Sequence, residues 1–175
     1  LADHFYINNG KGKFILQNEQ IPLLLKNKSC ISSADIDKDG DADLFVGVLA
    51  DATRYGVPQS SYLLLNQGGG QFKPAPATTW RPDSIGMVTS AVFTDINNDS
   101  WPDLVLAGEW MPLTICLNNK GSFTSQPVGG STGLWQSLYA ADINADGFTD
   151  ILAGNWGYNN KFVAGKNGPL KLYVK

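Results

Sequence analysis

Histidine, cysteine, methionine and glutamate are all scarce in this sequence of 175 residues. It has one His, two Cys and two Met, and its only glutamates are Glu19 and Glu109. Because His4 is the single histidine, a His-based catalytic triad within this chain is excluded. The two thiols, Cys30 and Cys116, lie at non-equivalent positions of the repeats described below. A disulfide between them stays open, and two buried small side chains are the favoured interpretation.

Long apolar runs, basic patches and helical periodicity are also missing. No apolar run approaches the length of a membrane span, so no membrane-spanning segment is expected. No basic patch carries interleaved aromatic residues, which argues against nucleic acid as a partner. No stretch shows the sustained apolar spacing of a helix, which favours an all-β chain. The chain begins with Leu1 instead of Met, which we interpret as processing or trimming.

The acidic residues are concentrated in three short segments, which we call the metal loops: residues 35–43, 95–103 and 142–150. Of 16 acidic side chains two are Glu, so 14 are Asp, and 11 of these lie in the metal loops. Positions one, three, five and nine of each loop are Asp or Asn, and short oxygen ligands of this kind suit Ca²⁺. The residue type at position seven differs between the loops, which fits a ligand that is a backbone carbonyl, because any residue can supply one. The sequence therefore predicts three Ca²⁺ sites with these ligands: Asp35, Asp37, Asp39, Asp41 and Asp43; Asp95, Asn97, Asp99, Trp101 and Asp103; Asp142, Asn144, Asp146, Phe148 and Asp150.

The loops differ from an EF-hand, although they begin in the same way. An EF-hand closes with a bidentate Glu at position twelve and has helices on both flanks, whereas the flanks of these loops have the composition of strands. Gly40 and Gly147 stand at position six, where a sharp turn needs positive φ. Ser100 stands there in the second loop, so we expect the second site to be the weakest or most distorted. The alternative is that Asp, Asn and Gly are simply common turn residues.

The metal loops belong to a longer repeat. Each loop lies between two apolar runs, and Asn/Gly-rich turns between further apolar runs at residues 62–72 and 114–123 are typical of β-hairpins. Residues 5–14 carry the same hairpin pattern. The first aspartates of the loops are spaced by 60 and 47 residues, and the longer interval contains an insertion at residues 49–61. Four antiparallel strands per repeat are typical of a propeller blade.

The motif Asp-x-Asp/Asn-x-Asp-Gly-x-x-Asp-Leu-x-x-Gly, followed by Leu-x-Asn-x-Gly-x-Gly-x-Phe, resembles the FG-GAP/VCBS repeat of integrin-α-like β-propellers. Residues 154–162 are similar to the bacterial secreted or surface branch related to ASPIC/UnbV-type proteins. The resemblance implies an all-β propeller of four-stranded blades with Ca²⁺ loops between the first and second strands, of which this chain is a fragment. The expected division is 1–26 (end of a preceding blade), 27–82, 83–130 and 131–175 (blades with the first, second and third loops). Residues 172–175 are expected to lead into a fourth loop, and the remaining blades are expected partners.

The resemblance also implies that the connections after the second and fourth strands gather on the face opposite the metal loops. These connections are rich in aromatic and polar residues, which suit a glycan or a protein. The alternative is that the aromatic residues pack between blades. The candidate ligand-binding residues are Arg54, Tyr55, Trp80, Arg81, Glu109, Trp110, Trp156, Tyr158 and Asn159.

These observations favour a non-enzymatic module that binds or adheres to a glycan or an extracellular protein. The alternatives are the propeller part of a secreted polysaccharide lyase or hydrolase, and a structural spacer. No catalytic residue is assigned. Weak Ca²⁺ sites suffice where Ca²⁺ is plentiful, so we expect an extracellular, cell-surface or periplasmic location.

Overall fold

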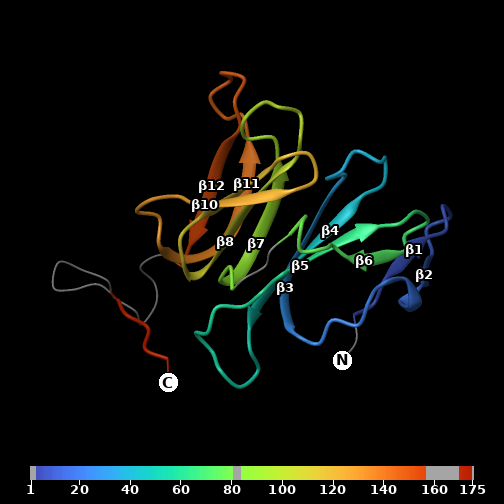
Figure 1. Ribbon diagram of the computed structural model, residues 1–175, viewed down its shortest axis with the longest axis horizontal. Helices are drawn as coiled ribbons and strands as arrows, with labels where there is room; N and C mark the ends of the chain where they lie inside the picture. Colours follow the sequence, from blue (N-terminus) through green and yellow to red (C-terminus); the bar gives the residue numbers. More distant parts are fainter. Residues whose placement is uncertain (1–2, 81–83, 157–169, 175) are drawn as a thin grey trace.

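The computed structural model describes residues 3–80, 84–156 and 170–174, and this part of the chain is an antiparallel all-β structure (Figure 1). A single 3₁₀ turn, η1 (Asn18–Gln20), is the helical element of the described residues. The strands are β1 (Tyr6–Asn8), β2 (Phe14–Leu16), β3 (Asn27–Ala34), β4 (Asp43–Ala50), β5 (Tyr62–Asn66), β6 (Phe72–Pro74), β7 (Met87–Thr94), β8 (Asp103–Met111), β9 (Thr114–Asn118), β10 (Phe123–Pro127), β11 (Gly133–Ala141) and β12 (Asp150–Asn155).

The strands form repeated meanders, as the sequence pattern predicted. Strands β3, β4, β5 and β6 pair in that order, and β7, β8, β9 and β10 do the same. We call these the first and second units, and β11 with β12 the third unit. Each metal loop joins the first two strands of its unit. The division of the chain at residues 26, 82 and 130 stays a prediction, although the strands of each unit fall within it.

The three predicted hairpins share one feature at their turns. In each hairpin an Asn faces a Phe across the last ladder pair before the turn. The pairs are Asn8 with Phe14, Asn66 with Phe72, and Asn118 with Phe123. Each Asn also accepts a hydrogen bond through its side-chain oxygen from a glycine amide in the turn that follows. The Asn side chain therefore stabilises the turn in all three copies.

The units lie side by side through their first strands. The Ser29 hydroxyl of β3 donates to the carbonyl of Val88 in β7. Between β7 and β11, the Thr89 hydroxyl donates to the carbonyl of Trp135 at 2.7 Å, and the Ser90 hydroxyl accepts the amide of Leu138 at 3.0 Å. Small hydroxyl side chains thus link consecutive first strands where their backbones come close.

The main core lies between the first and second units. Phe45, Leu63, Leu104, Leu106 and Cys116 are buried in one cluster. The exposure of one equivalent residue shows how one unit covers another. This residue lies in the second strand of its unit, two residues after the metal loop. Phe45 is 0 % exposed in the first unit, Val105 is 1 % exposed in the second, and Leu152 is 50 % exposed in the third. The third unit therefore presents an apolar face that the described residues leave uncovered.

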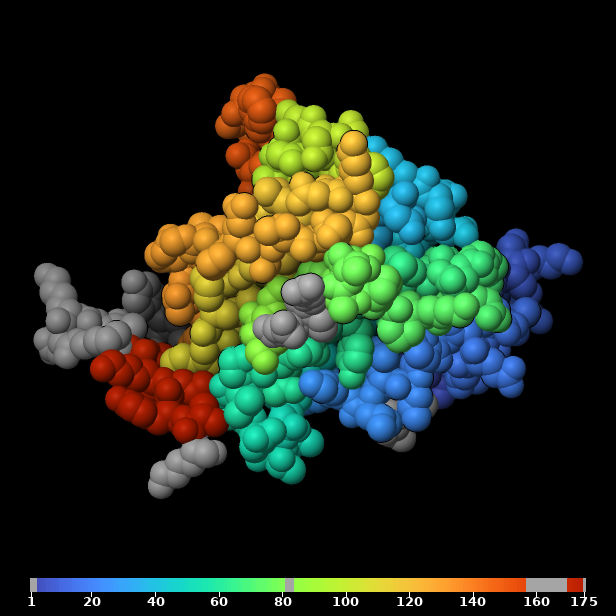
Figure 2. Space-filling model, viewed as in Figure 1, coloured from blue at the N-terminus to red at the C-terminus, as the bar shows by residue number. Residues whose placement is uncertain are grey.

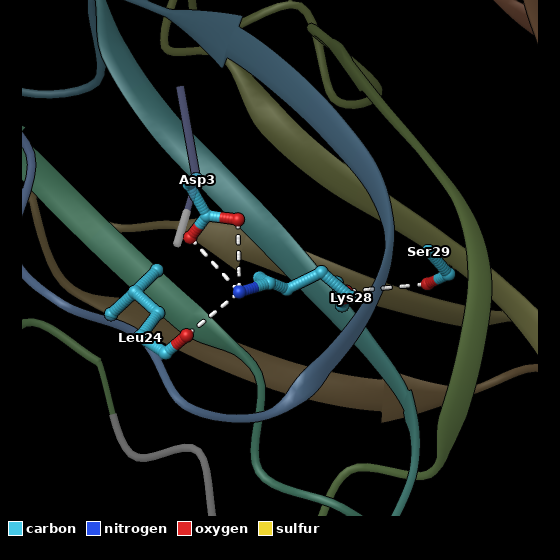
Figure 3. A network of polar contacts seen from close by, with 5 residues as sticks. Asp3, Leu24, Lys28 and Ser29 are labelled. Atoms are coloured by element: carbon cyan, nitrogen blue, oxygen red, sulfur yellow. Dashed lines mark hydrogen bonds and ion pairs between the residues drawn. The ribbon is translucent and has the colours of Figure 1, made fainter. Parts of the chain in front are cut away.

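Both ends of the described chain pack on the first unit. The Nζ atom of Lys28 in β3 forms an ion pair with Asp3 at 2.9 Å and donates to the carbonyl of Leu24 at 2.7 Å (Figure 3). At the other end, residues 170–174 lie beside the loop at residues 51–61 (Figure 2), where Leu172 and Val174 pack against Gly56. These residues form no strand. The expectation that residues 172–175 lead into a fourth metal loop stays a prediction.

Both cysteines are free. Burial raises the pKa of the Cys116 thiol to about 12, and the nearby Asp103 carboxylate adds to this rise. Burial also raises the pKa of Cys30, although hydrogen bonds from Ser29 and the Gly47 backbone oppose the shift. A thiolate is the nucleophile in thiol labelling, so both thiols are poorly reactive in the native chain.

We expect Cys116 in a Cys30→Ala variant to resist maleimide labelling at pH 8 until the chain unfolds. The reason is that a fully buried thiol with a pKa near 12 supplies almost no accessible thiolate. Mass spectrometry of the labelled chain over a urea series measures the protection. The unreduced wild-type chain should show two reactive thiols in strong denaturant. One or none would contradict two free cysteines, and rapid native labelling would contradict the buried position of Cys116.

Candidate metal loops and the opposite face

All three metal loops are shaped by the carboxylate at position one. In the first loop Asp35 accepts the backbone amides of Asp39 at 3.1 Å and Gly40 at 3.0 Å, one on each oxygen. The same two bonds recur in the second loop (Asp95 with Asp99 at 3.2 Å and Ser100 at 2.7 Å) and in the third (Asp142 with Asp146 at 3.2 Å and Gly147 at 2.9 Å). One side chain thus folds the turn back on itself in every copy.

The turn also requires left-handed backbone at two positions. Position six has φ of 96° at Gly40, 69° at Ser100 and 87° at Gly147. The expectation of positive φ at position six is confirmed, including for Ser100. Position four is left-handed as well, with φ values of 63°, 58° and 62° at Lys38, Asn98 and Ala145. Sequence reasoning missed position four because only Asn98 is a residue type that favours this region.

The side chains at positions one, three and five converge in the first loop. Ligand oxygens of Asp35, Asp37 and Asp39 all lie within 4.8 Å of one another. The Lys38 side chain, which lies between Asp37 and Asp39 in the sequence, has its Nζ atom 4.4 Å from the centre of the Trp101 ring in the second unit. In the other two loops the amide at position three contacts the carboxylate at position five, Asn97 to Asp99 and Asn144 to Asp146, both at 2.9 Å. This oxygen-rich donor set fits a hard cation such as Ca²⁺.

Position nine carries a buried carboxylate. Asp43 accepts the amide of Ile36 at 3.0 Å on one oxygen and the amide of Asn66 at 2.8 Å on the other. Asp103 repeats this arrangement with Ile96 at 3.0 Å and Asn118 at 2.7 Å. Both aspartates are fully buried. Each carboxylate therefore joins three segments of its unit: the start of the loop, the second strand and the third strand.

Burial raises the pKa of Asp43 and of Asp103, and this effect outweighs the backbone amides that lower it. Other carboxylates of the same loops, Asp37 and Asp39 or Asp95 and Asp99, raise the pKa further. A cation in the loop would act in the opposite direction, because a nearby positive charge favours the ionised form. Both oxygens of Asp43 and of Asp103 already accept backbone amides. That position nine also ligates the cation stays a prediction.

The first loop is attached to the second unit through Asn118. Its side-chain amide donates to the carbonyl of Ile36 in the first loop at 2.9 Å and to that of Pro102 at 3.1 Å. Ile36 itself is buried in the core between the two units. Beside this contact, a shallow pocket of about 250 Å³ is lined by Asp99, Trp101, Asn118, Asn119 and Lys120. Trp101 thus lies at the contact between units, under Lys38.

Three of the candidate ligand-binding residues come together in the structure. The Tyr55 hydroxyl donates to an oxygen of Glu109, and the indole nitrogen of Trp110 donates to the Tyr55 hydroxyl at 3.4 Å. Gln136, which sequence reasoning missed, donates to the other Glu109 oxygen at 3.4 Å. No sequence pattern indicated Gln136 as a candidate, because only the pairing of β11 with β8 brings it to Glu109. We call Tyr55, Glu109, Trp110 and Gln136 the Glu109 cluster.

The other candidates have different positions. Trp80 is only 5 % exposed and packs edge-on between Phe45 and Phe123, at centroid distances of 5.8 and 5.9 Å. Its placement among ligand-binding residues is therefore corrected: it packs in the core, as the alternative interpretation of the aromatic residues proposed. Arg54 is exposed beside the cluster, and Trp156 is exposed at the end of β12, where its amide donates to Leu134 at 3.1 Å. Arg81, Tyr158 and Asn159 lie outside the described residues.

Comparisons with known proteins agree with the repeat. Residues 95–153, about a third of the chain, match the family model of the FG-GAP-like repeat. Among solved structures, an Agrocybe aegerita lectin described as recognising non-reducing terminal N-acetylglucosamine is similar in fold. It has a TM-score of 0.55 and 22 % sequence identity over 86 % of this chain and 40 % of the lectin chain. This chain thus spans less than half the length of that lectin. No curated protein matches the sequence.

We expect Asp103→Ala to lower the free energy of unfolding by about 2–4 kcal/mol in EDTA, because it leaves two backbone amides without their acceptor, one of them fully buried. Urea unfolding followed by tryptophan fluorescence measures the loss. Asp150→Ala is the matched control: among the described residues Asp150 accepts one amide, that of Ile143, in a solvent-accessible place. Its loss should be about 1 kcal/mol or less. Equal losses for both variants would contradict the structural role assigned to position nine.

Proposed function

We propose that this chain is part of a calcium-stabilised FG-GAP-like β-propeller that acts as an extracellular binding module for a glycan or a protein. The observation that carries the proposal is the set of three metal loops with one geometry, each presenting side-chain oxygens at positions one, three and five. Ca²⁺ takes six to eight oxygen ligands. The proposed ligands are the side chains at positions one, three, five and nine and the carbonyl at position seven of each loop: Asp41, Trp101 and Phe148 supply that carbonyl.

The propeller interpretation rests on how the units pack. Consecutive first strands lie against one another. The residue after position one is buried in the first loop, where Ile36 contacts the core of the second unit, and the equivalent Ile96 is partly buried. The equivalent Ile143 is exposed, as is Leu152 on the second strand. A repeat of this type buries its apolar face only by stacking on a neighbour. We propose that a further four-stranded unit covers the exposed face of the third unit.

The binding role rests on the family match and on the fold likeness to a lectin. FG-GAP repeats are typical of extracellular proteins, which supports the proposed location. Outside cells Ca²⁺ is plentiful, so solvent-exposed loops of modest affinity would be filled. Within the described residues, no helix has the length and apolar character to cross a membrane.

We expect Ca²⁺, but not Mg²⁺, to raise the thermal midpoint of the chain relative to EDTA. Mg²⁺ demands a tighter octahedral geometry and dehydrates reluctantly. Asp37→Ala should remove about 2–3 kcal/mol of the stability gained in Ca²⁺, as expected for a roughly hundredfold loss of affinity at one saturated site. In EDTA its effect should be small, since Asp37 accepts one long amide bond, from Asp39 at 3.3 Å.

Asp41→Ala is the matched control for this experiment. It removes the same charge from the same loop, but position seven is proposed to ligate through its carbonyl, so most of the Ca²⁺ effect should remain. Loss of stability by Asp37→Ala to the same extent in Ca²⁺ and EDTA would contradict a metal role for Asp37. No midpoint shift with Ca²⁺ would contradict calcium stabilisation of this chain.

A further inference from the structure

The backbone at Trp110 is strained in a way that a tryptophan does not favour. Its φ is 60°, in the left-handed region, where a residue with a Cβ pays about 1–2 kcal/mol. In the pairing of β8 with β11, Glu109 faces Leu134 and Met111 faces Gly133. Trp110 is therefore the extra residue of a β-bulge, a place where left-handed backbone normally calls for glycine.

A bulge re-aims the side chain that it carries, and strained residues persist where the surroundings hold them. Here the re-aimed indole reaches the Tyr55 hydroxyl on the loop at residues 51–61. Tyr55 in turn contacts Glu109, and Gln136 approaches Glu109 from β11. Residues from two other segments thus converge on the carboxylate that β8 carries. Tyr55 is 53 % exposed, and Trp110 is partly exposed, so the aromatic surfaces remain accessible.

Within the described residues, about half of the hydrogen-bonding capacity of Glu109 is used. An ionised carboxylate has about four lone-pair sites, two on each oxygen. Tyr55 occupies one site on one oxygen and Gln136 occupies one on the other. Each oxygen thus has one hydrogen-bond partner among the described residues and capacity for a further donor. Two neighbouring hydroxyl groups can donate to the two oxygens of one carboxylate.

We infer that the Glu109 cluster binds a neutral sugar ring, with two adjacent ring hydroxyls donating to Glu109 and the apolar face of the ring against Trp110 or Tyr55. This inference rests on the proposed binding function and names its ligand class. Aromatic side chains offer apolar faces for the C–H surface of a pyranose. Among the described residues, the hydrogen-bond partners of Glu109 are the neutral Tyr55 and Gln136, so its carboxylate would repel an acidic sugar at close range.

The test uses the full chain in Ca²⁺ against immobilised neutral trisaccharides (N-acetylchitotriose, mannotriose and cellotriose) and the acidic trigalacturonate. We expect the wild type to bind at least one neutral trisaccharide and to prefer it over trigalacturonate. Trp110→Gly should weaken that binding about tenfold or more, which corresponds to the loss of one good contact. Relief of the left-handed strain by glycine should offset part of the packing that is lost with the indole, so the variant is expected to stay folded.

Two further variants separate the contact from general destabilisation. Glu109→Gln keeps the shape but removes the charge and one acceptor oxygen, so binding should again fall about tenfold. Tyr55→Phe removes one hydroxyl from the cluster and should weaken binding, whereas Tyr6→Phe removes a hydroxyl from a residue with similar exposure, 52 %, on the N-terminal hairpin. Tyr6→Phe should bind as the wild type does.

The outcomes distinguish this inference from the function on which it rests. Neutral-sugar binding that survives Trp110→Gly and Glu109→Gln overturns the assignment of the cluster while leaving a glycan-binding module in place. A preference for trigalacturonate also overturns it. A wild-type chain that is stabilised by Ca²⁺ but binds no trisaccharide overturns the sugar ligand, and leaves a protein partner as the function of the module.

Discussion

One buried carboxylate in each of the first two units holds the rest of the unit in register. Asp43 and Asp103 are taken out of water, which disfavours their charge, and each is compensated by two backbone amides. One amide belongs to the start of the metal loop and the other to the Asn that ends the third strand. If this carboxylate moved, the loop would lose its attachment to the hairpin, and Ile36 would lose the position that places it in the core between units.

The same arrangement separates the shape of the loop from the binding of a cation. Position one holds the turn by accepting the amides at positions five and six, and position nine holds its base. The loop geometry is thus specified by the chain itself. The converging carboxylates of Asp35, Asp37 and Asp39 repel one another, but at 4 Å in water such a pair costs only about 1 kcal/mol. We propose that a cation in the loop would replace this repulsion by attraction and so stabilise a turn that the carboxylates at positions one and nine already shape.

The periodic parts of the structure could be predicted from the sequence, because each is encoded locally. Alternating apolar runs and Asn/Gly turns specify strands and hairpins, and the spacing of Asp35, Asp37 and Asp39 brings their oxygens together. Features set by neighbouring units could not be predicted in this way. Lys38 and Ala145 give no local sign of left-handed backbone, which follows from the turn closed by position one. Gln136 joins Glu109 only because β11 pairs with the end of β8. The C-terminal residues pack against Gly56, and no sequence pattern predicted this contact.

Two tryptophans show why composition alone could not locate a ligand-binding face. Trp80 lies in the connection after β6 and Trp110 lies near the end of β8, and both were candidates for ligand contact. Trp80 has its indole nitrogen bonded to the carbonyl of Ser61 and its ring enclosed by Phe45 and Phe123, so its polar group and its apolar surface are both satisfied inside the chain. Trp110 instead occupies a bulge at an unfavourable φ and keeps part of its ring in solvent. Burial of an aromatic side chain stabilises the folded chain. Because Trp110 is only partly buried, packing offsets less of its backbone strain. Its strained and partly exposed position is therefore better explained by a surface that a ligand completes.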